Sequence, residues 1–515
     1  MQPLVNELFL EKAEALKPQL IQKEHRPLRM VTIEKNSEGF GRIAGERPIT
    51  ELAELHLGKG DTICLDYGDH YVGYLTLRLS SVGSIPDAPL FMKLKFGETA
   101  TEITDHSEDY NGRISSSWIQ EEWMHVDVLP AVITLPRRYA MRFLEISVLD
   151  TSPKFRVVIE GADFQAVSAV DGEQGGSYKT ADPLLQKIDA VSVKTLEDCM
   201  QDVFEDGPKR DRRLWIGDLR LEALTNYATF RNFDLVKRCL YLFAGSRMED
   251  GAVGACLFTQ PTLCVDDIYM YDYALFFVSI LLDYCKESGD EATARELWQT
   301  AKDQLEIGAG ARDARGVVKE DCKAFLDWKI GLNKQAGAHA VWIYSLRCGI
   351  ELGKLLGEDV ERYKEWLREA LQAAKEYLWD PEQKLFVSGA ERQVSYASQV
   401  WMVLAGVWDD ETNQQLLERT VQLDPEYNMV TPYMNHNFVM AYLSCGEYDK
   451  ALEYIRSYWG EMIRDGADTF WELYNPRNKR ESPYGSSIIN SYCHAWSCTP
   501  TYILRKYFPQ GEKAE

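Results

Sequence analysis

The chain has 515 residues, more than one hydrophobic core usually serves, so two domains are expected. Apolar residues make up 45% of the sequence and charged residues 27%, which excludes wholesale disorder. Its 80 acidic residues outnumber the 57 basic ones and give a net charge of −23, so the surface should repel phosphate backbones and anionic membranes. Nucleic acid and membranes are therefore not expected as partners, and an uncharged small molecule fits better.

The N-terminal region and the cysteines indicate a reduced, cytoplasmic protein. Residues 1–34 mix charges throughout and contain no apolar stretch of the kind found in secretion signals. Nor is any apolar run in the sequence long enough to span a bilayer. The eleven cysteines form no Cys-x-x-Cys pair and no His/Cys cluster, so they predict buried free thiols, with no metal site.

The first third of the chain alternates apolar and polar residues over short stretches that turn residues interrupt, which is typical of β-strands. No helical pattern separates these stretches, so we predict an antiparallel β-sandwich over residues 1–170. A scaffolding role is favoured for this domain over sugar binding. Strands are expected at Thr62–Leu65, Tyr74–Leu79, Phe91–Phe96, Arg142–Leu149 and Phe155–Ile159.

The rest of the chain, residues 171–515, has a helical period. Asp182 precedes Pro183 as an N-cap precedes the first helical residue. Twelve helices predict six hairpins closed into an (α/α)6 toroid, in which loops at one end converge on a central ligand funnel. An open helical solenoid is the competing architecture, but no repeat motif supports it. The expected helices are 183–200, 218–229, 233–244, 268–286, 290–307, 336–356, 358–377, 395–406, 411–422, 432–445, 447–464 and 487–506.

The densest chemical signal is the segment 205–218, whose glycines and proline predict a structured loop. A loop would allow Asp206, Asp211 and Asp218 to point inwards together, with Trp215 between them. Carboxylates accept paired hydrogen bonds from sugar hydroxyls, and an indole covers the apolar face of a sugar ring. The alternative is a solvated run of charges with local ion pairs.

A second signal is Glu472, which bulky apolar residues flank in the sequence. If this glutamate faces the funnel, partial desolvation favours a carboxylate that can take a proton from water. An exposed glutamate at a helix end is the alternative. Two further candidates are weak alone, because His494 and Trp328 could each belong to the hydrophobic core.

Together these segments resemble the bacterial α-L-rhamnosidases of glycoside hydrolase family 78, over most of the chain. Residues 206–218 are similar to that family's signature Asp-x-Pro-x-Arg-[Asp/Glu]-Arg-x-x-Trp-x-Gly-Asp. Further similar segments fall in the expected order, namely Leu65–Gly68, Val72–Tyr74, Leu135–Ala140, Leu326–Trp328, Trp471–Glu472 and Cys493–Trp496.

The resemblance implies an inverting hydrolase that removes terminal non-reducing α-L-rhamnose from small rhamnosides or oligosaccharides. Asp211 would be the general acid and Glu472 the general base, roughly 6.5–9.5 Å apart around a water molecule. Such chemistry needs no metal or organic cofactor, and small relatives suggest a homodimer. Tyr273 falls where the family often has Trp. Residues implied to hold the rhamnose are Asp206, Arg210, Trp215, Asp218, Tyr273, Trp328 and His494.

Several alternatives stay open at this point. Lys209 and three arginines (Arg210, Arg212 and Arg213) crowd Asp211, and cations favour the charged form of a carboxyl group, which is wrong for an acid. Asp218 is therefore an alternative proton donor. The chain could also be an (α/α)6 hydrolase for another sugar, or a sugar-binding protein without catalytic activity.

Overall fold

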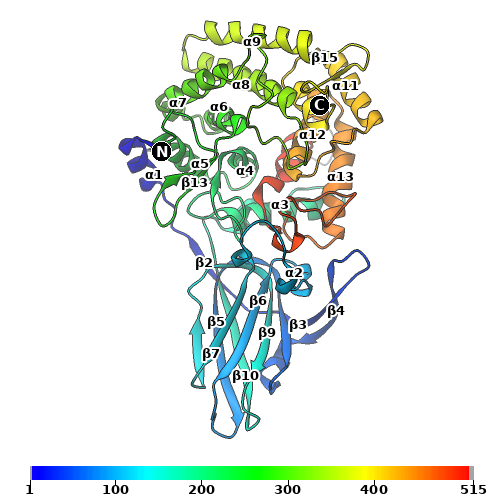
Figure 1. Ribbon diagram of the computed structural model, residues 1–515. Helices are drawn as coiled ribbons and strands as arrows, with labels where there is room; N and C mark the ends of the chain where they lie inside the picture. Colours follow the sequence, from blue (N-terminus) through cyan, green and yellow to red (C-terminus); the bar gives the residue numbers. More distant parts are fainter. Residues whose placement is uncertain (1–2, 510–515) are drawn as a thin grey trace.

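In the computed structural model, which describes residues 3–509, a sheet region and a helical region lie end to end (Figure 1). The sheet region comes first along the chain, and the helices form a ring above it in the figure. None of the helices in the described part of the chain has the length and apolar character that a membrane span requires.

The sheet region is built around β5 (Thr62–Gly83), which pairs antiparallel with β3, β8, β9 and β10. Two strands expected within this range are one continuous strand, whose register against β9 shifts between Asp66 and Tyr71. The other strands of the sheet are β2 (Ile21–His25), β3 (Arg29–Lys35), β4 (Gly41–Pro48), β6 (Leu90–Gly97), β7 (Glu121–Val126), β8 (Ala131–Thr134), β9 (Tyr139–Asp150) and β10 (Phe155–Ser168).

Alternate residues of these strands form the core of the sheet region. Leu75, Leu77 and Leu79 of β5 are buried together with Leu144 and Ile146 of β9. This period of two leaves the intervening side chains nearer to solvent, as expected for stacked antiparallel strands. The predicted order of a β domain followed by a helical domain is confirmed.

The helical region consists, within the described residues, of an inner and an outer ring of helices. In the inner ring α4 packs against α6, α6 against α8, α8 against α10 and α10 against α12, and the ring closes through the short turn Ala495–Ser497 and α14. Nearly every residue of α4 is buried, whereas the outer helix α9 buries one narrow stripe. The helices are α3 (Pro183–Cys199), α4 (Ile216–Ala228), α5 (Phe233–Gly245), α6 (Tyr271–Ser288), α7 (Glu291–Gly310), α8 (Gln335–Leu356), α9 (Glu361–Ala373), α10 (Tyr396–Leu404), α11 (Asp410–Leu423), α12 (Pro432–Ser444), α13 (Tyr448–Arg464) and α14 (Pro500–Tyr507).

The connection between the two regions runs from the end of β10 to the start of α3. Asp182 caps α3, since its Oδ1 accepts hydrogen bonds from the backbone N–H groups of Leu184 and Leu185 at 2.9 and 3.3 Å. The predicted N-cap is thus confirmed.

Two segments differ from the expectation. The last predicted helix, 487–506, is α-helical only in α14, and its earlier part contains two short 3-10 turns, Ser487–Ile489 and Ala495–Ser497, because backbone groups there bond to other segments instead. Ala495 N–H donates to the carbonyl of Asp206 at 2.9 Å, and His494 N–H donates to that of Phe470 at 2.9 Å. At the other end of the chain, α1 (Glu7–Ala15) was not expected, and it packs against α5 of the helical region.

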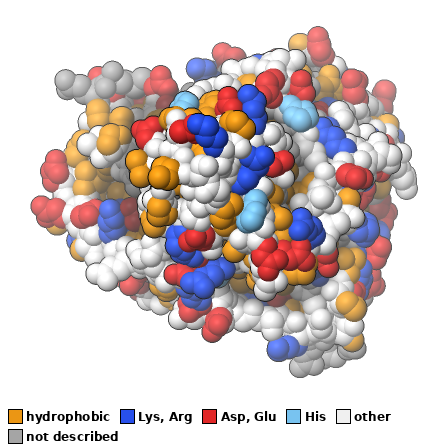
Figure 2. All heavy atoms as spheres, turned by 90° about the horizontal axis from the view of Figure 1, so that it is seen from below, with side chains coloured by type: hydrophobic (Ala, Val, Ile, Leu, Met, Phe, Trp, Pro, Cys, Tyr) orange, Lys and Arg blue, Asp and Glu red, His pale blue; other side chains and the backbone are white. Residues whose placement is uncertain are grey.

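Acidic and basic side chains alternate over the outer end of the sheet region. Figure 2 shows this face, where Lys and Arg side chains lie among Asp and Glu side chains and small apolar areas. The net charge of −23 is therefore not gathered into a single acidic patch on this face.

Candidate active site

The segment between α3 and α4 folds around the carboxylate of Asp206. Its Oδ2 accepts a hydrogen bond from the backbone N–H of Asp211 at 3.1 Å, and its Oδ1 accepts one from that of Arg213 at 3.0 Å. Arg212, between these two donors, has a φ of 63°, which non-glycine residues adopt rarely and mostly at functional sites. Asp206 therefore holds the loop that carries Asp211.

Two glycines of this loop lie where a side chain would not fit. A Cβ atom at Gly207 would lie 2.4 Å from the carbonyl oxygen of Arg210. One at Gly217 would lie 2.1 Å from Cζ of Tyr273. Because Gly217 has no Cβ, the ring of Tyr273 packs directly against the first turn of α4, the turn that contains Asp218.

Glu472 is buried, with 2% of the residue exposed, so it is not an exposed residue at a helix end. Its Oε2 accepts hydrogen bonds from Arg210 Nη2 and, at 3.3 Å, from the backbone N–H of Ser491. Its Oε1 accepts one from the hydroxyl of Tyr484. Both oxygens of the carboxylate are thus oriented by donors from two other segments.

The guanidinium of Arg210 joins the two predicted catalytic carboxylates, although they come from segments far apart in the chain. Its Nη2 binds Glu472, while its Nη1 lies 3.4 Å from Asp211 Oδ1. Burial opposes the charge on Arg210, but Glu472 and Tyr484 raise its pKa well above the ordinary value, so it stays a cation. The side chain of Asp211 is 20% exposed and that of Glu472 is 3% exposed. Asp211 is therefore the more accessible of the two.

The other cations that crowd Asp211 in the sequence bind elsewhere in the structure. Lys209 binds Glu98 and Glu102, Arg212 donates to the carbonyl of Arg138, and Arg213 lies 3.9 Å from Asp266. Of the four cations near Asp211 in the sequence, only Arg210 contacts it, and Arg210 also pairs with Glu472.

Asp206, Asp218 and His494 form the buried floor of the site. Nε2 of His494 lies 3.9 Å from Asp206 Oδ2, and its Nδ1 lies 3.8 Å from Asp218 Oδ1. Burial lowers the pKa of His494 well below its ordinary value, so the ring is neutral. Burial and the neighbouring Asp211 raise the pKa of Asp206 to about 8, and burial and Asp206 raise that of Asp218 well above its usual range.

Aromatic rings form a continuous wall beside these carboxyl groups. Ring centroids are separated by 6.5 Å between Trp215 and Tyr273, 5.5 Å between Tyr273 and Phe325, and 5.2 Å between Phe325 and Trp328. Trp496 stacks on Phe325 at 5.7 Å. The wall therefore reaches from the loop after α3 to the segment before α8 and carries all three predicted aromatic residues.

Four of the buried polar atoms that have no protein partner among the described residues lie at this site. They are Nε1 of Trp215, Nε1 of Trp328, Oδ1 of Asp218 and Nδ1 of His494. Buried polar atoms are nearly always hydrogen-bonded, so a group of orphans around one set of aromatic faces indicates the place of a polar ligand. Hydroxyl groups next to an apolar ring face are the chemistry of a sugar.

Two buried carboxylates support the site without being among the residues predicted to act in it. Asp272 accepts the backbone N–H groups of Phe325 and Leu326, both at 2.9 Å. Asp327 accepts the hydroxyl of Thr431 at 2.7 Å and the N–H of Val430 at 2.9 Å. These buried carboxylates fix the segment that presents Trp328. Leu326 has a φ of 53°, an unusual conformation within that segment.

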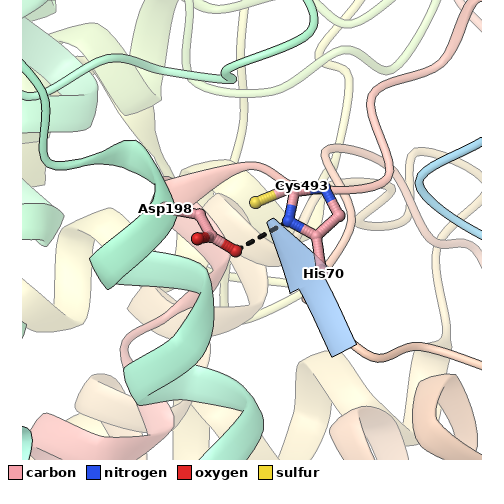
Figure 3. A group of neighbouring side chains, drawn as sticks. All are labelled: His70, Asp198 and Cys493. Carbon is pink, nitrogen blue, oxygen red and sulfur yellow. Dashed lines mark hydrogen bonds and ion pairs between the residues drawn. The ribbon is translucent and has the colours of Figure 1, made fainter. Parts of the chain in front are cut away.

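Beneath the site, His70 of β5 meets Asp198 of α3 and Cys493 (Figure 3). Within residues 3–509 these are the one group of His, Cys, Asp and Glu side chains close enough together to bind a metal ion. An ion-pair network already accounts for the group. Nδ1 of His70 lies 2.7 Å from Asp198, whose other oxygen accepts from Lys194 at 2.9 Å.

The network continues to the loop between α3 and α4, which carries Lys209 and Asp211. Nε2 of His70 lies 3.5 Å from Glu98, and Glu98 pairs with Lys209 at 3.1 Å. Burial opposes a charge on the ring, but Cys493, Asp198 and Glu98 raise the pKa of His70 well above its ordinary value. A charged His70 therefore bridges two buried carboxylates and ties the sheet region to the helical region.

Comparison with known families identifies relatives for both regions. Residues 27–166 match the glycosyl hydrolase family 78 alpha-rhamnosidase N-terminal domain. Residues 173–507 match the bacterial alpha-L-rhamnosidase six-hairpin glycosidase domain. No curated protein sequence matches the chain.

Solved structures of rhamnosidases are similar to most or all of this chain. A rhamnosidase from Klebsiella oxytoca with rhamnose bound is 45% identical and has a TM-score of 0.95, with 99% of this chain and 100% of that chain covered. A family 78 rhamnosidase of Bacillus sp. GL1 is 23% identical with a TM-score of 0.74, over 86% of this chain and 46% of that one. An α-L-rhamnosidase of Streptomyces avermitilis complexed with L-rhamnose is 15% identical with a TM-score of 0.66, over 96% and 44%. The last two show the fold alone.

Proposed function

The chain belongs to the bacterial α-L-rhamnosidases of glycoside hydrolase family 78, and from this we propose that it is an inverting enzyme in which Asp211 is the general acid and Glu472 the general base. The observation that carries the proposal is Arg210, whose guanidinium contacts both carboxyl groups. In an inverting reaction one carboxyl group protonates the glycosidic oxygen while the other takes a proton from water on the opposite face of the sugar.

The proposed roles follow from differences between the two carboxyl groups. The leaving group must depart towards solvent, and Asp211 has a side chain that is 20% exposed. Glu472 is buried and accepts hydrogen bonds from Arg210, Tyr484 and Ser491, all of which stabilise its negative charge. A carboxylate that three donors hold in one orientation suits a base, which must be aligned with the water that it deprotonates.

The remaining site residues would hold the rhamnose. The carboxyl groups and the ring of His494 would bond to hydroxyls, and the aromatic wall would cover the apolar face of the sugar. As the reaction proceeds, an ionised carboxylate near the anomeric carbon would stabilise the positive charge that develops there. The residues proposed to bind are Asp206, Arg210, Trp215, Asp218, Tyr273, Trp328 and His494.

Asp218 is a second candidate for the acid. Burial and Asp206 raise its pKa well above the usual range, which favours the protonated form that an acid needs. Its side chain is only 3% exposed, however, against 20% for Asp211, so it is less accessible to a leaving group that departs towards solvent. We therefore prefer Asp211.

We further propose that the substrates are small molecules with a terminal rhamnose. Family membership favours rhamnose over the other sugars, and hydrolysis over binding alone, among the alternatives that the sequence left open. The cytoplasmic location and the homodimer stay predictions.

A panel of 4-nitrophenyl glycosides tests this proposal. We expect turnover of the α-L-rhamnoside, no turnover of α-D- and β-D-glucosides, and release of free rhamnose from a rhamnose-terminated disaccharide. Rapid cleavage of a polysaccharide with only internal rhamnose, with no free rhamnose released, would contradict the proposed preference for chain ends.

A further inference from the structure

Tyr484 contacts three members of the site but is not among the residues that the sequence singles out. Its hydroxyl accepts a hydrogen bond from Arg210 Nη1 at 3.2 Å and donates one to Glu472 Oε1. Its ring lies 4.4 Å from the guanidinium of Arg210, and 5.8 Å separates its centroid from that of Trp328. Arg210, Tyr484 and Glu472 therefore form one directed chain from a cation through a hydroxyl to a carboxylate.

We propose that Tyr484 is a positioning residue that orients the Glu472 carboxylate towards the attacking water, and that the sheet region holds Tyr484 in place for this task. The inference rests on the proposed role of Glu472 as the base. It assigns to the hydrolytic reaction a residue outside the set carried by the family signature segments.

The hydrogen bonds of Glu472 leave a defined place for water. A carboxylate offers about four acceptor sites, two on each oxygen. Arg210 and the N–H of Ser491 occupy those on Oε2, and Tyr484 occupies one on Oε1. The second acceptor site on Oε1 has no protein donor among the described residues, and we place the attacking water there. Without the Tyr484 hydroxyl, Oε1 has no protein donor, and the carboxylate is held through Oε2 alone.

The sheet region secures the backbone of this segment. The N–H of Arg113, in the connection between β6 and β7, donates to the carbonyl of Tyr484 at 2.7 Å. The segment also closes on itself, since Tyr484 N–H donates to Ser482 Oγ at 3.2 Å and that hydroxyl donates to Asn490 Oδ1 at 2.7 Å. The sheet region therefore contributes more to the site than the scaffold that the sequence favours.

The protonation state of Tyr484 suits a donor. Burial and Glu472 raise its pKa well above the ordinary value, although Arg210 opposes this, so the hydroxyl keeps its proton. The charged or titratable groups that face the pair are Arg210, Asp211 and Asp218. None of the three can replace the hydrogen bond to Oε1, because Arg210 already binds the other oxygen and the two acids act at longer range.

Tyr484→Phe tests the inference, because it removes one oxygen atom and keeps the ring. We expect kcat on 4-nitrophenyl α-L-rhamnoside to fall by about 10- to 100-fold, the loss expected for one hydrogen bond to a charged group, with KM changed little. Loss of a donor to the ionised base also moves the acidic limb of the kcat–pH profile to higher pH, by about one unit. Tyr396→Phe is the matched control, since its hydroxyl donates to the carboxylate of Asp424 at 3.2 Å, away from the site. That variant should keep wild-type kinetics.

Three results would overturn the inference: wild-type kcat in Tyr484→Phe, a loss of kcat with an unmoved pH profile, or an equal loss in Tyr396→Phe. A Glu472→Gln/Tyr484→Phe double variant should be no slower than Glu472→Gln alone, because the hydroxyl acts through Glu472. Full activity of Glu472→Gln would instead remove the base assignment itself. Failure of the inference and failure of the proposed function are therefore distinguishable.

Discussion

An Asp211→Asn variant is expected to lose about 10²- to 10⁴-fold in kcat on an alkyl α-L-rhamnoside and far less on the 4-nitrophenyl α-L-rhamnoside. An alkoxide is a poor leaving group and needs a proton as the bond breaks, whereas 4-nitrophenolate leaves without one. Because Asn is nearly isosteric and Asp211 is partly exposed, folding should be unaffected. Steady-state kinetics on both substrates, with thermal unfolding as a check, measure the effect.

Asp218→Asn is the matched comparison for the acid. Asp218 is buried and is proposed to bind the sugar, so Asp218→Asn should lower kcat/KM on both substrates to a similar degree. If Asp218→Asn shows the strong leaving-group dependence and Asp211→Asn does not, the acid is Asp218. If neither variant shows it, the acid is a different group.

A Glu472→Gln variant is expected to lose about 10²- to 10⁴-fold in kcat on both substrates alike, because water must be deprotonated whatever the leaving group. The amide keeps the size of the side chain but cannot take up the proton. The buried Arg210 would then lack its carboxylate partner, so some loss of thermal stability is also expected. The comparison of the two substrates separates the base from the acid.

Added azide gives a second measurement on the Glu472→Gln variant. Azide is a nucleophile that needs no base, so it should restore part of the rate and yield the β-L-rhamnosyl azide. Asp211→Asn, which keeps the base, should gain much less with a poor leaving group. Absence of any azide effect combined with wild-type water hydrolysis would contradict the role of Glu472.

The sequence predicted the fold correctly where the apolar residues of a segment repeat with the period of a strand or a helix. The alternation in β9 and β10 and the helical period from Pro183 onwards each record which face of an element is buried. The loop after α3 was recognisable because its glycines and proline exclude a helix while its acidic residues repeat. The structure adds the reason for Gly217, which is the close approach of Tyr273.

Contacts between distant segments could not be predicted in the same way. The stretch before α14 has helix-compatible composition, but its backbone groups pair with Asp206, Phe470 and Glu472. Tyr484 lies between Glu472 and residue 487, where no element was predicted, and its carbonyl accepts a hydrogen bond from Arg113 of the sheet region. When an irregular segment is buried by contacts with a distant segment, neither segment needs a regular repeat of apolar residues, so the contact cannot be read from the sequence. The sequence therefore pointed to the proposed acid, the proposed base and the proposed sugar-binding residues, but not to Tyr484.

The effect of the cations around Asp211 was another point that the sequence left open. Four cations around Asp211 argued against an acid there, but spacing along the chain does not show which way a side chain points. In the structure Lys209 is taken up by Glu98 and Glu102, and Arg212 by a backbone carbonyl. Only Arg210 faces the site, and its shorter contact is to Glu472.

Proton NMR during the first minutes of hydrolysis tests the central claim most directly, because the anomer released reports which face the water attacks. Attack by a water held at Glu472, opposite a leaving group protonated at Asp211, produces β-L-rhamnose first, with the α anomer growing in later as the free sugar equilibrates. Early appearance of α-L-rhamnose would mean retention of configuration and would contradict the proposed division of labour between these two carboxyl groups.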